Sequence, residues 1–423
     1  MKRFLLTMFI CIMSNNLYAD PFTNAPGERA RAMGGAFAAI ADDSSCFWHN
    51  PAGLAIMKAN IDIQFSAIQA LVRKPEPENL NNAIIGTHQK YDIKTGDLSF
   101  SIGAGFGPGS IIMYYHKPYF INHHYNPRKR ENIPIVESAF GQVNEEIYSI
   151  GVGYGLSSSN KKYSLGWTID YLNMKSNYSN IWQINGYNDQ NDTTFYRYIG
   201  SDGRTYDARS GSIGIMMKPF DNFFKSYLFS IGSVYRLPCH GIRREKETDT
   251  FLEEYFKVFY PAFAAHLVQA GPFFDQLIIE RPPSFDLGLA IRRQGNSRLS
   301  LAVQYGFVDW SHTNRRINTD YNKYSVGMEY VAQNKYLFND KITLLSLRTG
   351  YYYSKPTPLT DDWPEVEGLT FGLGISSGAF AFEVALENRI IDYLHNEKEE
   401  NLLVSFSVSI SSGINIDDIV KSQ

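Results

Sequence analysis

Along most of the chain, apolar residues alternate with small or polar residues over runs of about ten residues, and each run ends at a turn. In residues 299–307 the odd positions are Leu, Leu, Val, Tyr and Phe, whereas the even positions are Ser, Ala, Gln and Gly. Residues 163–171, 285–292, 380–387 and 402–410 repeat this pattern. Because successive side chains of a strand point to opposite faces, each run predicts a strand with one apolar face.

Two architectures explain such alternation, a soluble β-sandwich and a transmembrane β-barrel. The solvent face of a sandwich favours Lys, Glu and Thr, but the second face here is dominated by Gly, Ser and Ala with isolated charges. The runs also match the roughly 9–11 residues that a tilted strand needs to cross a bilayer, whereas strands of soluble sheets typically have about five or six. The pattern therefore favours the barrel over the sandwich.

Counting the runs gives fourteen strands, an even number as in bacterial barrels. The predicted strands are 60–68, 97–106, 110–119, 146–156, 161–174, 208–218, 226–236, 284–293, 298–309, 321–332, 341–353, 368–377, 379–389 and 401–410. Long connections, such as 120–145, 175–207 and 237–283, alternate with short turns, such as 107–109 and 377–378. Residues 60–410 are therefore predicted to form an all-β, 14-stranded antiparallel barrel with long extracellular loops and both termini in the periplasm.

The ends of the chain lack this alternation. Lys2 and Arg3 precede an apolar stretch too short to span a membrane, and Ala19 supplies the small residue of a cleavage site. We interpret residues 1–19 as a signal peptide, with an uncertainty of a residue or two at the cut. Residues 411–423 are expected to form a periplasmic tail.

Composition removes several classes of protein. Mean hydropathy is −0.27, and after residue 20 no apolar stretch approaches the ~18–20 residues of a spanning helix. Without Lys2 and Arg3 the chain has 38 basic and 43 acidic residues, which gives no support to nucleic-acid binding. Cys46 and Cys239, the two cysteines after residue 20, are expected to stay unpaired.

Known catalytic and metal-binding motifs are missing. The chain has no His-Glu-x-x-His, Cys-x-x-Cys or Gly-x-Ser-x-Gly sequence. His123 and His124 are adjacent, but without a third placed ligand they are more simply explained as solvated loop residues. We expect no enzyme activity, no metal and no cofactor.

A more specific motif precedes the first strand. Residues 27–57 mix small residues with two turn signals, 42–44 and 50–51, and this predicts a compact unit of short helices. The stretch resembles the N-terminal hatch of FadL-type and TodX-type outer-membrane transporters. The resemblance rests on residues 31–36, 41–43, 50–54, 282–284, 309–311 and 347–351.

The resemblance implies a 14-stranded barrel in the outer membrane of a diderm bacterium, plugged by a hatch over residues 20–59. It implies passive uptake of hydrophobic compounds, such as long-chain fatty acids, by a monomer with outer-membrane lipid around it and lateral exit through the wall. Hatch and gating residues would be Phe22, Asn50, Pro51 and Ala52, although a purely structural role for the Asn-Pro pair is equally plausible because Asn caps turns and Pro starts helices. Residues 110–119 show no internal glycine or bulge signal, so lateral exit rests on the resemblance alone.

Two further sets of residues could contact a ligand. In the loop 237–283, apolar residues recur every three or four positions, which predicts an amphipathic helix that either captures ligand or packs against other loops. Its candidate capture residues are Phe256, Phe259, Phe263 and Leu267. In the lumen, Arg292 and Arg348 could bind a substrate carboxylate. Ion pairs with the acidic residues on the same side of the wall are the more economical explanation, and these are Asp170, Asp286, Glu329 and Glu383.

Alternatives to the transporter remain open. PorV-type barrels have a similar hatch sequence and act as docking scaffolds for proteins in secretion systems. A general porin is the third possibility, although porins usually narrow the lumen with a loop.

Overall fold

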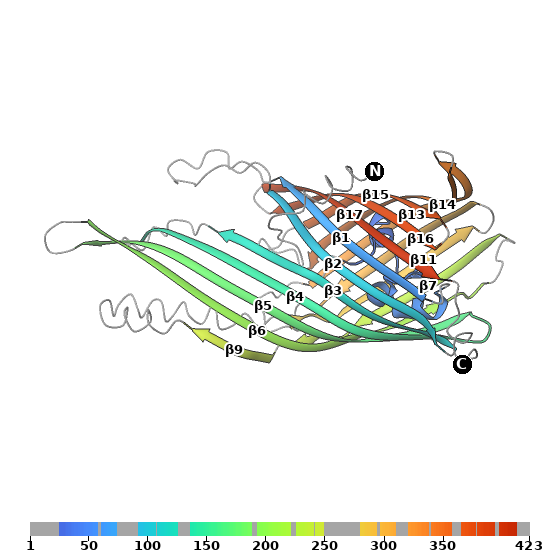
Figure 1. The fold of residues 1–423 in the computed structure, drawn as a ribbon, viewed down its shortest axis with the longest axis horizontal. Coiled ribbons are helices and arrows are strands. Elements are labelled where there is room, and N and C mark those ends of the chain that lie inside the picture. The colour runs from blue at the N-terminus through green and yellow to red at the C-terminus, as the bar shows by residue number, and fades with distance from the viewer. Residues whose placement is uncertain are drawn as a thin grey trace.

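The computed structural model describes most of the chain as strands around a small N-terminal unit (Figure 1). The described residues are 25–57, 61–73, 92–106, 108–125, 136–187, 193–220, 226–240, 242–248, 280–293, 297–309, 320–337, 340–357, 365–377, 379–393 and 397–412. All the strand pairs are antiparallel.

Fourteen strands close into a barrel, as the alternation predicts. They are β1 (Ile61–Arg73), β2 (Asp92–Phe106), β3 (Gly109–Tyr125), β4 (Val136–Ser157), β5 (Tyr163–Tyr187), β6 (Thr193–Met217), β7 (Tyr227–Arg236), β11 (Ser284–Arg293), β12 (Ser297–Val308), β13 (Asp320–Leu337), β14 (Asp340–Thr357), β15 (Glu365–Ser377), β16 (Phe380–Tyr393) and β17 (Glu397–Ser412). Neighbours in sequence pair with each other, and the first strand closes the barrel against the last. Ser411 and Ser412 pair with β1, so the final strand extends two residues into the segment predicted as a tail.

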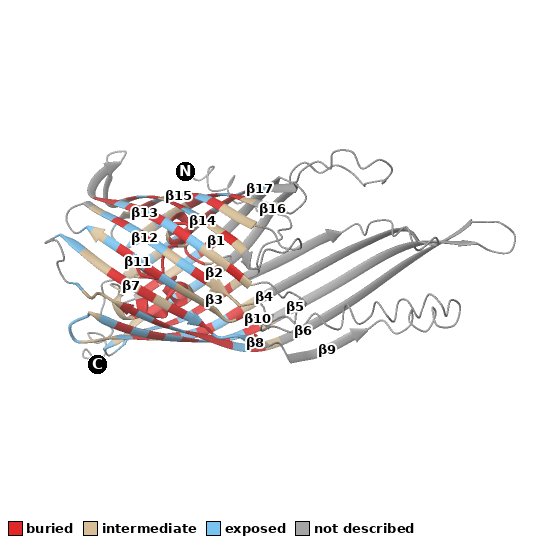
Figure 2. Ribbon diagram, turned by 180° about the vertical axis from the view of Figure 1, so that it is seen from behind, coloured by how far each residue is buried: buried red, intermediate tan, exposed pale blue. Residues whose placement is uncertain are grey.

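The two faces of the wall differ as the sequence predicts. On β5, Leu165, Trp167 and Ile169 are exposed on the outside, while Ser164 and Thr168 are buried on the inside. The exposed apolar residues recur at every second position around the barrel (Figure 2). A continuous apolar outer surface suits contact with lipid, and the pairing of β1 with β17 removes the two open edges that a flat sheet would have.

Strands β4, β5 and β6 are much longer than predicted and reach well beyond the other strands at one end (Figure 1). Much of the predicted loops 120–145 and 175–207 is therefore strand. In these extended parts of the strands, neither face is consistently apolar in the sequence. The alternation therefore stops, although the backbone pairing continues. The predicted loop 237–283 also contains strands, β8 (Cys239–His240), β9 (Ile242–Thr248) and β10 (Glu280–Arg281); β9 pairs with β6, and β8 with β10.

The wall has an interrupted seam between β2 and β3. Their pairing ends at Ser99 opposite His116, but β2 continues beside β1 and β3 continues beside β4. The register of β3 against β4 also shifts between His116 and Tyr119. The interpretation of residues 110–119 as free of a bulge signal was wrong, because Pro118 lacks the backbone N–H that a regular ladder requires.

Among the described residues, three short helices lie inside the barrel: α2 (Glu28–Ala32), α3 (Cys46–His49) and the 3-10 helix η1 (Pro51–Ile56). Their apolar side chains form a buried cluster with residues of the inner wall, including Ile112, Met216 and Ala290. None of the described helices is long and apolar enough to cross a membrane. We call residues 20–59 the hatch, and the structure describes residues 25–57 of it.

Candidate functional site

The Asn-Pro motif joins the hatch to the wall. Asn50 is fully buried, and its Nδ2 donates to the carbonyl oxygens of Ala38 at 2.8 Å and of Ile215, on β6, at 3.1 Å. Its Oδ1 accepts a hydrogen bond from the backbone N–H of Ala52 at 3.1 Å, and Pro51 occupies the first turn of η1. One side chain therefore caps a hatch helix and binds a barrel strand.

Glycines let the hatch and the wall approach each other closely. A Cβ atom built on Gly214 would lie 2.0 Å from Asn50 Oδ1. Gly34 has φ +64, and its Cβ would lie 2.8 Å from the carbonyl oxygen of Tyr351. Larger residues would collide at either position, and Gly34 also adopts a left-handed conformation that side chains disfavour.

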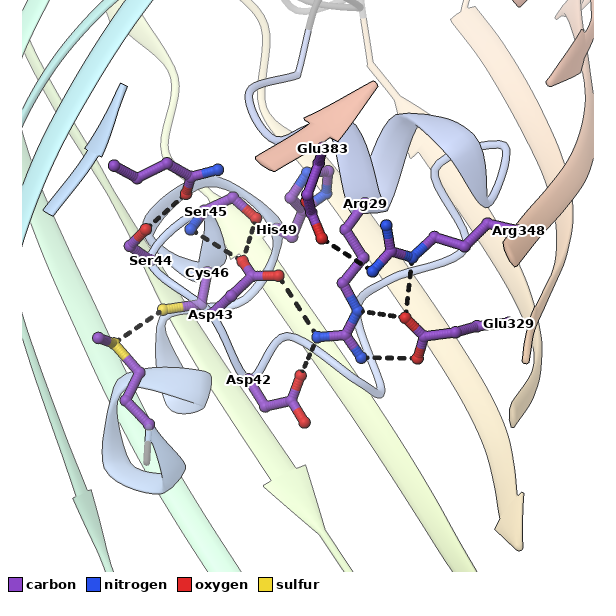
Figure 3. Close-up of polar contacts among 12 residues, drawn as sticks. Arg29, Asp42, Asp43, Ser44, Ser45, Cys46, His49, Glu329, Arg348 and Glu383 are labelled. Atoms are coloured by element: carbon purple, nitrogen blue, oxygen red, sulfur yellow. Dashed lines mark hydrogen bonds and ion pairs between the residues drawn. The ribbon is translucent and has the colours of Figure 1, made fainter. Parts of the chain in front are cut away.

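Arg29 is the centre of an ion-pair network between the hatch and β13 (Figure 3). Its Nε and Nη2 donate to the two carboxylate oxygens of Glu329 at 2.7 and 2.8 Å. Its Nη1 lies 2.5 Å from Asp42 Oδ1 and 3.5 Å from Asp43 Oδ2. This forked geometry fixes the direction of the guanidinium group as well as neutralising the carboxylate.

The two predicted lumen arginines belong to the same network. Arg348 Nε donates to Glu329 Oε1 at 2.9 Å, and its Nη2 donates to Glu383 Oε1 at 2.8 Å. Arg292 Nη1 lies 3.0 Å from Asp42 Oδ2. The structure thus places both arginines in internal ion pairs, which the sequence favoured over contact with a substrate carboxylate.

A second network ties α2 to β16. Arg31 Nη1 lies 3.2 Å from Glu387 Oε2, and Arg389 Nη2 lies 2.7 Å from Glu387 Oε1. Tyr352 OH also donates to Glu387 at 2.6 Å. Arg31 lies within the hatch motif, but the sequence gives no sign of this network because the paired residues lie far apart in the chain.

A third contact involves the aromatic end of α3. The guanidinium groups of Arg236 and Arg281 lie 5.6 and 5.2 Å from the centre of the Trp48 ring. Arg236 also pairs with Asp286 at 2.6 Å, and Arg281 with Asp170 at 3.4 Å. The predicted internal acids Asp170 and Asp286 therefore have arginine partners.

Burial strongly alters the pKa values of several hatch residues, among them Glu28 and His49. Burial raises the pKa of Glu28 to about 7, although hydrogen bonds from Ser407 and Ser66 oppose the rise. Burial lowers the pKa of His49 to about 3, and its Nε2 lies 2.9 Å from the carbonyl oxygen of Pro26. His49 is therefore a neutral donor at physiological pH, and Glu28 takes up a proton more readily than an exposed carboxyl.

We predict that Glu28→Gln changes how hatch stability depends on pH. A carboxyl whose pKa rises from 4.5 to about 7 on folding stabilises fully below pH 4.5 and loses that contribution as pH rises to about 7. The variant should match the wild type near pH 4 and exceed it by about 3 kcal/mol at pH 8, since one pKa unit corresponds to ~1.4 kcal/mol. Urea unfolding in detergent between pH 4 and 8 measures this difference.

The control for this prediction is Glu367→Gln on the outer face of β15, which should leave the pH profile of the wild type unchanged. His49 acts in the opposite sense. As pH falls below 6.5, this imidazole is protonated in the unfolded chain but not in the folded state, so the folded state loses stability. Both variants retain His49, so its effect is the same in all the proteins compared. A Glu28→Gln profile parallel to the wild type from pH 4 to 8 would contradict the prediction.

Several predicted residues cannot be compared with the structure. The signal peptide, Phe22, and the loop residues Phe256, Phe259, Phe263 and Leu267 lie outside the described residues. Cys46 and Cys239 are both buried and form no disulfide. Within the described part of the chain, no three His, Cys, Asp or Glu side chains are grouped to hold a metal ion.

Sequence comparison finds no matching family model and no matching curated protein. Solved structures, in contrast, match over nearly the whole chain. A Pseudomonas aeruginosa FadL homologue is 12% identical with a TM-score of 0.55, and the match covers 95% of this chain and 99% of that one. The chain has the fold of the FadL-type channels.

Two toluene transporters have the same fold. The Ralstonia pickettii transporter TbuX is 12% identical with a TM-score of 0.54, and the match covers 92% of this chain and 98% of that one. The Pseudomonas putida transporter TodX is 13% identical with a TM-score of 0.51, with 92% and 99% covered. The FadL-type fold expected from the hatch motif is thus confirmed, at identities too low for the fold to determine the substrate.

Proposed function

We propose that the protein is an outer-membrane channel for passive uptake of hydrophobic small molecules. The observation that carries the proposal is a closed barrel with an apolar outer surface whose interior contains a tightly packed N-terminal unit. Known proteins with this fold include toluene transporters. Such a channel would need no cofactor and perform no enzymatic reaction.

The hatch would act as the plug. A 14-stranded barrel without internal filling is wide enough to leak, because lumen width increases with strand number. The contacts of Asn50, Arg29 and Arg31 with the wall support a resting state in which the plug is closed. Under this proposal Phe22, Asn50, Pro51 and Ala52 help to shape or hold the gate.

The seam between β2 and β3 would supply lateral exit into the membrane. Strands β2 and β3 pair from the short turn at Phe106 and Gly109 as far as Ser99 and His116. Past this last pair, the two strands no longer pair with each other. An apolar molecule gains ~0.8 kcal/mol for each buried methylene, so exit into lipid avoids the cost of re-entering water. The short-turn end, where β1 begins and β17 ends, would face the periplasm.

Two substrate groups are candidates, long-chain fatty acids and uncharged hydrocarbons. Arg292 and Arg348, which the sequence offers for a fatty-acid carboxylate, are already paired with Asp42, Glu329 and Glu383. A carboxylate would have to displace one of these acids and leave it buried without a cation, which is costly. The geometry therefore favours uncharged hydrocarbons.

Uptake of radiolabelled toluene and oleate tests the proposal. Cells of a diderm host that lacks FadL-type channels should take up toluene several-fold faster with the protein than with an empty vector. Phe256→Asp combined with Phe259→Asp should reduce uptake, whereas Lys257→Gln in the same segment should not.

Other outcomes would replace the proposal. Uptake of neither compound would contradict the transporter. Large steady conductance in a planar bilayer would indicate an open porin, whereas co-purification with a secretion complex would indicate a PorV-type scaffold.

A further inference from the structure

The inner wall on one side of the hatch is lined by hydroxyl groups. Ser407 on β17 lies opposite Ser66 on β1, Ser66 lies opposite Ser99 on β2, and Ser99 lies opposite His116 on β3. We call the buried serines of these three strands the serine tract: Ser66, Ser99, Ser101, Ser405 and Ser407. The described inner positions of β17, β1 and β2 include the acid Asp62 but no arginine or lysine.

The hatch is attached differently on its two sides. Toward β11, β13 and β16 it is held by arginine–carboxylate pairs, among them Arg29 with Glu329 and Arg31 with Glu387. Toward the serine tract, the side-chain contacts are hydroxyl hydrogen bonds, from Ser66 to Glu28 at 2.8 Å and from Ser44 to Gln64 at 2.5 Å. Ion-paired hydrogen bonds are roughly twice as strong as those between neutral groups, so the side facing the tract separates more easily.

One buried hydroxyl of the tract has unused hydrogen-bonding capacity. Ser405 is 0% exposed, and its Oγ has no hydrogen-bond partner. Buried polar groups are nearly always paired, so a hydroxyl left unused indicates a place where a passing polar group can bind.

The tract also ends at the interrupted seam. Ser99 and His116 form the last pair between β2 and β3, so the hydroxyl row reaches the point where the wall separates. A molecule moving between the hatch and the tract would arrive at the proposed lateral exit without crossing the ion-paired side.

We propose that the passage through the barrel runs along the serine tract, between Glu28 and the inner faces of β17, β1 and β2, and selects uncharged molecules with at most a hydroxyl or carbonyl group. The inference rests on the proposed transport function and specifies its route. Neutral donors and acceptors bind such groups. An anion would face Asp62 and Glu28 without a cation on the tract, which is unfavourable in a buried site.

Cysteine labelling with an apolar reagent tests the route. Ser407→Cys and Ser99→Cys lie on the tract, and Ser346→Cys and Ser354→Cys on β14 are matched controls on the inner wall. The controls are slightly more exposed, at 7% and 8% against 2% and 6%, so simple access would label them first. The full-length protein in outer-membrane vesicles is treated with benzyl methanethiosulfonate, and mass spectrometry follows modification above the wild-type background from Cys46 and Cys239.

The expected result is at least tenfold faster labelling of the two tract cysteines than of the controls. The anionic sulfonatoethyl methanethiosulfonate should label all four positions at or below the control rate. Equal or faster labelling of Ser346→Cys or Ser354→Cys would overturn the route, and rapid labelling of the tract by the anionic reagent would overturn the selectivity. Ser405→Cys and Ser101→Cys replace a tract variant that does not show the heat-modifiable mobility of a folded barrel.

The uptake assay separates this inference from the proposed function. If the wild type takes up toluene while the controls label first, the channel stands and the route is wrong. If the wild type takes up neither toluene nor oleate, the transport function fails whatever the labelling pattern.

Discussion

Glu329→Gln is expected to destabilise the folded protein by about 3–5 kcal/mol, because removing one partner of a buried ion pair leaves uncompensated charge. Glu329 is 2% exposed and binds both Arg29, at 2.7 and 2.8 Å, and Arg348, at 2.9 Å. Glutamine keeps the shape but offers only one acceptor oxygen to two guanidinium groups. Urea unfolding in detergent micelles measures the loss of stability.

The same substitution should loosen the plug, which bilayer recordings detect as channel openings that the wild type lacks. The matched control is Glu367→Gln on β15, whose carboxylate accepts a hydrogen bond from Tyr351 on the exposed outer face. It should change the free energy of unfolding by no more than ~0.5 kcal/mol, and its conductance should equal that of the wild type. If the two variants behave alike, the network around Arg29 does not hold the hatch.

Asn50→Ala is expected to cost about 2–4 kcal/mol and to raise conductance. The alanine leaves the carbonyl oxygens of Ala38 and Ile215 without their side-chain donor and removes the cap on the Ala52 N–H. Each buried group that loses its partner costs about 1–3 kcal/mol. Urea unfolding and bilayer recording again supply the two measurements.

Asn388→Ala provides the comparison, because this asparagine lies on the exposed face of β16 and tests the loss of an amide outside the hatch. A destabilisation below 1 kcal/mol for Asn50→Ala, equal to that of Asn388→Ala, would show that the Asn-Pro motif contributes little to holding the hatch. A large loss of stability with unchanged conductance would assign Asn50 to folding alone.

The sequence predicted the barrel well because lipid imposes a simple rule on every spanning strand. Leu165, Trp167 and Ile169 must be apolar on the outside, whatever lies inside. The extensions of β4, β5 and β6 escaped prediction because their sequence does not alternate between apolar and polar residues, although the strands continue to pair through their backbones.

The candidate site was less predictable for a different reason. Arg29 and Glu329 are 300 residues apart, and only the closed barrel brings the hatch against β13. Alternation correctly placed Arg292 and Glu329 on inner faces, but it could not identify Asp42 as the partner of Arg292 or Arg29 as the partner of Glu329. Pro118 did carry a signal for the wall irregularity, since a proline inside a strand removes a donor from the ladder.

The unequal lengths of the strands set the height at which ligands would enter. Strand β5 has 25 residues, and at ~3.3 Å per residue it is roughly 80 Å long, against a hydrocarbon core of about 30 Å. With a tilt of ~40°, more than 20 Å of this strand would stand above the lipid if the extended end faces outward as proposed. The β4–β6 side of the mouth would then form a screen above the membrane, while strands β1 and β2, with 13 and 15 residues, would end closer to its surface. Molecules could therefore reach the barrel from one flank rather than from directly above.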